Sequence, residues 1–177
     1  TGLEILSSKH FEKICDNKEE ADRAIIYLFF NILNFLPFAA AVDEWQEEIY
    51  EKKIMNWNSR NKLWKELSKK YRPYISWGKY DVYEEYGRMT RPHFFQAPFY
   101  YIEYAIAYIG VLQLWLNSFE NYDLSVEKYI RSLSLGGQIS LKDLFTNIGS
   151  ELNFDENFIN DLITNVSTNI LKNHGHT

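Results

Sequence analysis

Residues that could cross-link this chain or break its backbone are scarce. The sequence has one cysteine, Cys15, together with 4 prolines and 8 glycines in 177 residues. A single cysteine cannot form an internal disulfide, so nothing indicates an oxidising compartment. So few Gly and Pro exclude a turn-rich β-sandwich or β-barrel. The length suits one domain of ordinary size, and we expect residues 1–177 to form a single helical domain.

Excess positive charge and targeting signals are also missing. The net charge is −5, and no cluster of Lys and Arg is present to neutralise phosphates, which excludes nucleic acid as a partner. The start has no basic segment followed by an apolar run, so no signal peptide is indicated and we expect a cytoplasmic protein. Residues 1–6 read as the interior of a helix rather than its start. The chain therefore looks like a piece of a longer protein.

The apolar run 99–116 has nearly the length of a membrane span. It contains Glu103, Gln113 and four tyrosines, however, and we find no second run of this kind. A buried core helix therefore explains the run better than a span, and no membrane partner is expected.

The familiar motifs of metal and nucleophile sites are absent. The sequence has no H-E-x-x-H, C-x-x-C, P-loop or G-x-S-x-G motif. His174 and His176 could bind a metal together, although a frayed tail is the simpler interpretation. We therefore expect no metal ligand in this chain.

The sequence is rich in aromatic residues, and its apolar residues show helical periodicity. Phe, Trp and Tyr make up 17% of the chain, and apolar residues recur at three- and four-residue steps. No segment alternates with period two, which predicts an all-α fold. The expected helices are 17–53 with a kink or break at Pro37, Ser59–Tyr71 capped by Ser59, a short one near 82–87, one from Pro98 through Leu116, Ser125–Leu135, Leu141–Ile148 and Asp155–Asn173.

Three kinds of side chain could carry chemistry near the apolar run. Glu103 lies among apolar residues, so it should face a cleft or form a salt bridge to Arg88 or Arg91. His93 precedes the run in a loop between two prolines. Tyr100 and Tyr104 are one helical turn apart, where they could pack in the core or donate hydrogen bonds to a developing oxyanion. Alone, these residues do not name a function.

One segment is specific to a family. Pro92-His93-Phe94 followed by P-F-Y-Y-I-E-Y-A-I-A at 98–107 resembles the C-terminal catalytic segment of oligoendopeptidase F-type zinc metallopeptidases, which include thimet oligopeptidase. The stretches G-L-E-I-L at 2–6, L-P-F at 36–38 with V-D and W-Q at 42–46, and L-S-L-G-G at 133–137 agree with it. The resemblance covers essentially the whole chain.

The resemblance implies a mostly helical, zincin-like fold and a zinc-dependent endopeptidase acting on short peptides. The family holds zinc with an H-E-x-x-H helix and a downstream glutamate, all of which would precede Thr1 and lie in the missing N-terminal portion of the enzyme. The isolated chain should therefore bind no zinc and be inactive. Alternatively, the chain is a non-catalytic helical binding or orphan module derived from that family.

The resemblance also assigns roles to individual residues. His93, Tyr100 and Tyr104 match residues that contact the substrate and the tetrahedral oxyanion. Tyr101 and Glu103 are further candidates for substrate binding. Glu4 lies seven residues after the expected third ligand, on the same helix face, and would orient a ligating histidine without touching the metal.

Overall fold

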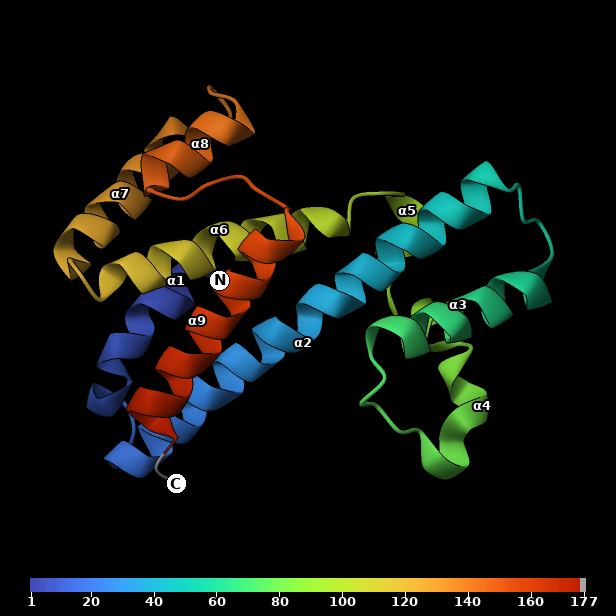
Figure 1. The fold of residues 1–177 in the computed structure, drawn as a ribbon, viewed down its shortest axis with the longest axis horizontal. Helices are drawn as coiled ribbons and strands as arrows, with labels where there is room; N and C mark the ends of the chain where they lie inside the picture. Colours follow the sequence, from blue (N-terminus) through green and yellow to red (C-terminus); the bar gives the residue numbers. More distant parts are fainter. Residues whose placement is uncertain (176–177) are drawn as a thin grey trace. The chain divides into compact units, whose positions relative to one another are not determined.

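The structure is a computed structural model that describes residues 1–175, and throughout them every regular element is a helix. The prediction of an all-α fold is confirmed. Figure 1 labels the α-helices, which are α1 (Gly2–Ser7), α2 (Lys18–Glu51), α3 (Trp57–Tyr71), α4 (Asp81–Glu84), α5 (His93–Gln96), α6 (Ile102–Ser118), α7 (Tyr122–Leu135), α8 (Leu141–Ile148) and α9 (Glu156–His174). Short 3₁₀ helices are η1 (Ser8–Lys13), η2 (Gly78–Tyr80) and η3 (Gly87–Thr90).

The chain folds into two compact units. Unit 1 comprises Thr1–Leu33 and the chain from Ala107 onward, and unit 2 comprises Asn34–Ile106. Helices α2 and α6 each contribute residues to both units. The sequence pattern did not indicate this division, because the apolar periodicity of α2 continues across its boundary.

Unit 1 has its own core of aliphatic residues and one ring pair. The rings of Phe29 and Trp115 lie 4.3 Å apart between centroids. Leu6, Leu114 and Ile148 form a buried cluster that joins α1, α6 and α8. Helices α7 and α8 lie side by side (Figure 1). The other buried apolar residues of this unit include Ile5, Ile25, Ile32, Leu112, Phe145, Leu162, Val166 and Ile170.

Unit 2 is built around aromatic side chains. Trp45 of α2 and Trp64 of α3 meet edge to face, with 6.3 Å between their centroids, and Phe94 of α5 contacts both rings. Such pairs stabilise a core beyond the area they bury. The Trp45 indole N–H donates to the Arg60 carbonyl at 3.0 Å, so the buried ring keeps its polar group satisfied. This core places α5 and the start of α6 against α2.

Helix α2 begins after an N-cap residue, Asn17. The Asn17 side chain accepts a hydrogen bond from the Glu20 N–H at 2.9 Å, and the Glu20 carboxylate accepts one from the Asp16 N–H at 2.9 Å. The helix continues through Pro37, so the expected break is absent. By length and composition α2 could cross a membrane, but its apolar residues supply the cores of both units.

Helix α3 begins two residues earlier than predicted, and its cap is Asn56 rather than Ser59. The Asn56 side chain accepts from the Ser59 N–H at 3.1 Å, while Ser59 itself lies in the first turn. Both residue types favour helix starts, and Asn56 takes the role because its backbone is extended.

We expect Asn56→Ala to lower the free energy of unfolding by about 1 kcal/mol, because an N–H of the first turn then has no partner. Ser59→Ala is the matched control and should change it by less than about 0.5 kcal/mol. Urea denaturation of both variants measures the difference. Equal losses in the two variants would contradict the assignment of the cap.

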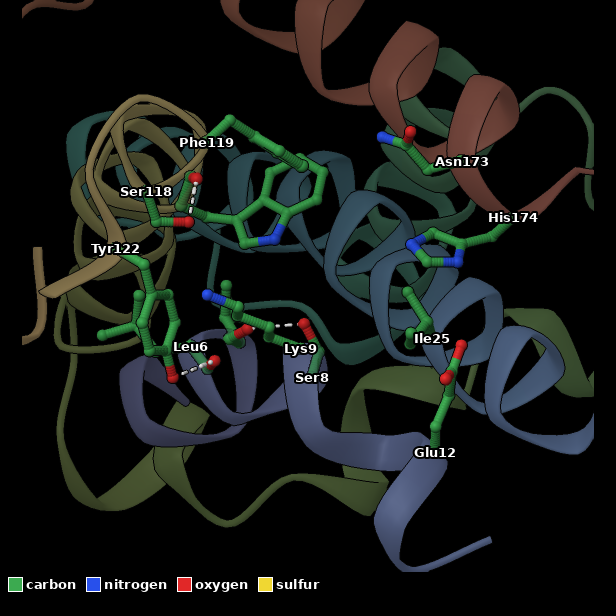
Figure 2. Close-up of a pocket in the computed structure, with 12 residues that line it drawn as sticks. Leu6, Ser8, Lys9, Glu12, Ile25, Ser118, Phe119, Tyr122, Asn173 and His174 are labelled. Carbon is green, nitrogen blue, oxygen red and sulfur yellow. Dashed lines mark hydrogen bonds between the residues drawn. The ribbon is translucent and has the colours of Figure 1, made fainter. Parts of the chain in front are cut away.

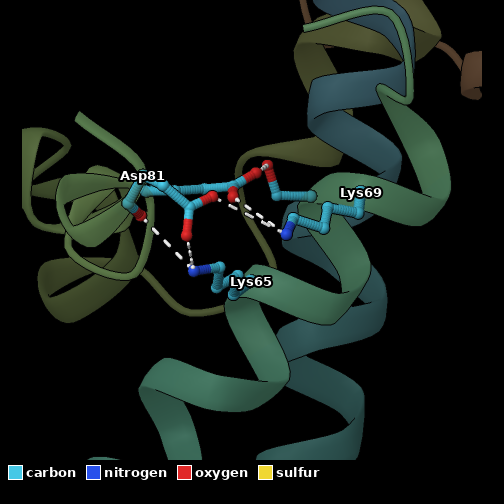
Figure 3. A network of polar contacts seen from close by, with 5 residues as sticks. Lys65, Lys69 and Asp81 are labelled. Carbon is cyan, nitrogen blue, oxygen red and sulfur yellow. Dashed lines mark hydrogen bonds and ion pairs between the residues drawn. The ribbon is translucent and has the colours of Figure 1, made fainter. Parts of the chain in front are cut away.

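Ion pairs and a hydrogen bond hold helix α4 against α3 (Figure 3). Lys65 pairs with the Asp81 carboxylate, and Lys69 lies 3.7 Å from it. This contact with Lys65 lowers the pKa of Asp81 below its usual range. The nearly buried Glu84 accepts a hydrogen bond from the Ser68 hydroxyl at 3.1 Å. The segment that leads to α5 is thereby held against α3.

The last helices follow the sequence prediction closely. Helix α8 has the predicted bounds, and Gly149 ends it with φ of 78°, a left-handed conformation that glycine adopts freely. Helix α9 extends one residue beyond the prediction, to His174, whose Nδ1 lies 2.6 Å from Asp22 Oδ1. His174 is therefore not part of a frayed tail, and His176 lies outside the described residues.

Candidate functional site: an aromatic cluster around His93

The segment between η3 and α6 carries most of the predicted site residues. His93 begins the short helix α5, and the chain then turns at Pro98 and Phe99 before α6 starts at Ile102. The sequence placed the helix start at Pro98, which is wrong. Phe99 has φ of 63°, in the left-handed region that a right-handed helix excludes. Tyr100 and Tyr101 therefore precede the helix, and Tyr104 lies in its first turn.

A buried side chain of α2 holds this turn. The Oε1 atom of Gln46 accepts a hydrogen bond from the Phe99 N–H at 3.1 Å, and Gln46 is only 1% exposed. The Phe99 ring also packs on the Tyr50 ring, with 5.4 Å between centroids. The resemblance covered Gln46 but gave it no role, and no sequence signal predicted the left-handed backbone at Phe99.

His93 and three tyrosines form one group, which we call the His93 cluster (His93, Tyr100, Tyr101 and Tyr104). The imidazole is stacked on the Tyr100 ring at 6.2 Å between centroids, and it meets the Tyr101 ring at 5.7 Å and the Tyr104 ring at 6.0 Å. The rings of Tyr100 and Tyr104 are 5.3 Å apart. The structure thus brings together the residues that the resemblance assigned to substrate contact.

Members of the His93 cluster differ in exposure. Tyr100 and Tyr104 are 39% and 38% exposed, whereas Tyr101 is only 7% exposed and packs on Phe35, Phe38 and Phe94. Tyr101 therefore anchors the cluster in the core of unit 2, and two phenols face outward. His93 is partly exposed.

Polar groups of the His93 cluster are suited to donating hydrogen bonds. The pKa of Tyr104 is raised, first by a hydrogen bond with Tyr100 and then by loss of solvent and by the nearby Tyr100, Tyr101 and Glu103. The phenol therefore stays protonated and can donate well above neutral pH. The His93 Nδ1 atom is buried and has no hydrogen-bond partner among the described residues.

Glu103 forms no salt bridge to Arg88 or Arg91, so this alternative of the prediction is wrong. Because α6 starts only at Ile102, Glu103 lies exposed in its first turn, where the helix dipole favours a carboxylate. Arg88 instead is 1% exposed, donates to Asn61 Oδ1 at 2.5 Å and lies over the rings of Trp45 and Trp57. Burial lowers the pKa of Arg88.

Glu4 belongs to unit 1, on the short helix α1. Its side chain is 65% exposed, so its carboxylate is accessible to another group. Within residues 1–175, no group of three or more His, Cys, Asp or Glu side chains could hold a metal ion. The described residues therefore do not fit a zinc site by themselves.

Comparison with known proteins identifies the family of this chain. The family model for Peptidase family M3 matches residues 6–163. An oligoendopeptidase F structure aligns with 90% of the chain at 26% identity and a TM-score of 0.75, and a structure of PZ peptidase A with an inhibitor aligns with 97% at 25% identity and a TM-score of 0.85. The chain covers only 28% and 30% of these two proteins. Among curated proteins, none matches. The extent of the family match, together with the helical fold shared with both peptidases, shows that the chain belongs to peptidase family M3.

Proposed function

We propose that this chain is the C-terminal, substrate-contacting portion of a zinc-dependent oligoendopeptidase that hydrolyses internal bonds of short peptides. The observation that carries the proposal is the pair of exposed phenols, Tyr100 and Tyr104, that pack against His93 in a chain of peptidase family M3. Zinc would be held by the N-terminal portion of the intact enzyme, where it supplies the Lewis acid of peptide hydrolysis.

Each residue of the site has a role within this proposal. Tyr100 and Tyr104 donate hydrogen bonds to the oxygen that becomes negative as the peptide carbonyl is attacked, and a donor aimed at developing charge speeds such a reaction. The raised pKa of Tyr104 keeps its phenol protonated. His93 donates to a neighbouring carbonyl of the substrate and thereby orients it. Tyr101 supports the three residues from the core, and Glu103 is a further contact at the exposed edge.

Glu4 has a separate role in the proposal. Its exposed carboxylate accepts the second ring N–H of a zinc-ligating histidine in the intact enzyme, which fixes the orientation of that ligand. Residues of this kind tune metal affinity without touching the metal, so Glu4→Gln would weaken zinc binding rather than abolish it.

The test compares the isolated chain with the intact enzyme. We expect the purified 177-residue chain, supplied with zinc, to bind less than one equivalent and to leave a short fluorogenic peptide uncut. The intact enzyme should cleave the same peptide at an internal bond, as mass spectrometry of the products would show. Stoichiometric zinc and rapid cleavage by the chain would contradict the division of roles. An intact protein without activity would favour a non-catalytic binding module.

A further inference from the structure

Unit 1 contains a cavity that none of the proposed roles uses. Its volume is about 360 Å³, and Figure 2 shows the side chains around it. The walls come from α1 and η1, the first half of α2, the end of α6, the start of α7 and the end of α9. The lining residues are Ile5, Leu6, Ser8, Lys9, Glu12, Ile25, Trp115, Ser118, Phe119, Tyr122, Asn173 and His174.

Apolar side chains form the base of the cavity. Leu6, Ile25 and Trp115 are each 5% exposed, and the Phe119 ring lies edge-on to Trp115 at 4.9 Å between centroids. These residues are held in place by the core of unit 1. A ligand on this base would gain contact with rigid apolar surface.

Hydroxyl groups in the walls are already engaged with the backbone. Ser8 donates to the Ile5 carbonyl at 2.7 Å, Ser118 to the Trp115 carbonyl at 2.6 Å and Tyr122 to the Leu6 carbonyl at 3.1 Å. The Nδ1 atom of His174 is likewise engaged, with Asp22. The polar groups left to recognise a ligand include the charged side chains of Lys9 and Glu12.

Two opposite charges at the rim form no ion pair with the described residues. Lys9 extends toward the Tyr122 side, with its ammonium 3.9 Å from that ring centroid, and Glu12 points toward His174 (Figure 2). They are three residues apart, yet neither forms an ion pair with any described residue. A cation and an anion thus both line the cavity above its apolar base.

We propose that this cavity binds a zwitterionic dipeptide with apolar side chains. Its carboxylate pairs with Lys9, its ammonium group pairs with Glu12, and its side chains rest on Trp115 and Ile25. The volume lies within the range of small-ligand sites, which is about 300–1,000 Å³. The proposal does not depend on the role of the His93 cluster.

Calorimetric titration of the full 177-residue chain with the dipeptide Leu-Phe tests the proposal. We expect saturable binding of one dipeptide, accompanied by a change in fluorescence of Trp115, the tryptophan of unit 1. The same dipeptide acetylated and amidated at its ends should bind at least about tenfold more weakly, because hydrogen bonds to charged groups are lost. Glu12→Gln and Lys9→Met should each weaken Leu-Phe binding by about tenfold.

Matched controls separate this site from others. Glu127→Gln and Lys13→Met remove an exposed charge of unit 1 outside the cavity and should leave binding unchanged. Tyr104→Phe distinguishes this cavity from the His93 cluster and should also leave it unchanged. The proposal is overturned if Leu-Phe does not bind, if the capped dipeptide binds equally well, or if Tyr104→Phe rather than Glu12→Gln abolishes binding.

Discussion

Tyr104→Phe in the intact enzyme should lower kcat by about 10²–10³ and leave KM nearly unchanged. The reason is that the phenol is proposed to donate to charge that develops only in the transition state, so its loss does not weaken ground-state binding. Tyr100→Phe should have a similar effect if both phenols reach the oxyanion. Steady-state kinetics with a fluorogenic peptide measures both parameters.

Phe keeps the ring contacts of the His93 cluster, so the substitution isolates the hydroxyl group. Tyr74→Phe is the matched control, since Tyr74 is an exposed tyrosine of the same unit, outside the cluster. It should retain wild-type kcat. If Tyr100→Phe and Tyr104→Phe also retain it, the two phenols only pack against His93 and the proposed oxyanion role fails.

Gln46→Leu in the intact enzyme should lower kcat by about 10², because a catalytic group displaced by about 1 Å can cost that much. The substitution removes the acceptor for the Phe99 N–H, and leaving a buried donor unpaired costs about 1–3 kcal/mol. The turn at Phe99 then loses its anchor, and Tyr100 moves relative to Tyr104. The pKa of Tyr104 should fall toward its usual range, because the hydrogen bond with Tyr100 raises it.

Two further variants show whether Gln46 acts through position. Gln46→Glu keeps an oxygen acceptor at the same place and should recover part of the lost kcat. Gln138→Leu removes an exposed glutamine from the connection between α7 and α8 and should change neither parameter. NMR titration of tyrosine-labelled enzyme follows the pKa of Tyr104. A reduced kcat with an unchanged pKa of Tyr104 would indicate a general loss of stability instead.

Features that depend on neighbouring residues could be predicted from the sequence, whereas features that depend on contacts between distant residues could not. Helix α8 was predicted residue for residue, because Ser140 caps it, Gly149 ends it and its apolar residues are periodic. The start of α6 was not, because the contact between Gln46 and Phe99 joins residues 53 positions apart. The misplaced start also explains the error at Glu103. A helix that began at Pro98 would place Glu103 in its second turn, whereas the helix begins at Ile102 and Glu103 lies in its first turn.

The candidate site shows the same limit. The residues around His93 were named through the family resemblance, since periodicity alone left Tyr100 and Tyr104 equally consistent with core packing. Which tyrosine is buried was not predicted, because the burial of Tyr101 depends on contacts with residues distant in sequence, among them Phe35 and Phe38 of α2. The cavity of unit 1 was not anticipated either, as its walls come from segments more than 100 residues apart.

The left-handed backbone at Phe99 limits the conformations that the turn before Tyr100 and Tyr104 can adopt. A residue with a side chain in this conformation costs about 1–2 kcal/mol, and glycine would avoid that cost. Glycine, however, populates both signs of φ about equally and would allow the turn many arrangements. Phenylalanine, seated against Tyr50 and bonded to Gln46, allows few. The protein thus accepts a less stable turn in return for a narrower set of conformations at Tyr100 and Tyr104.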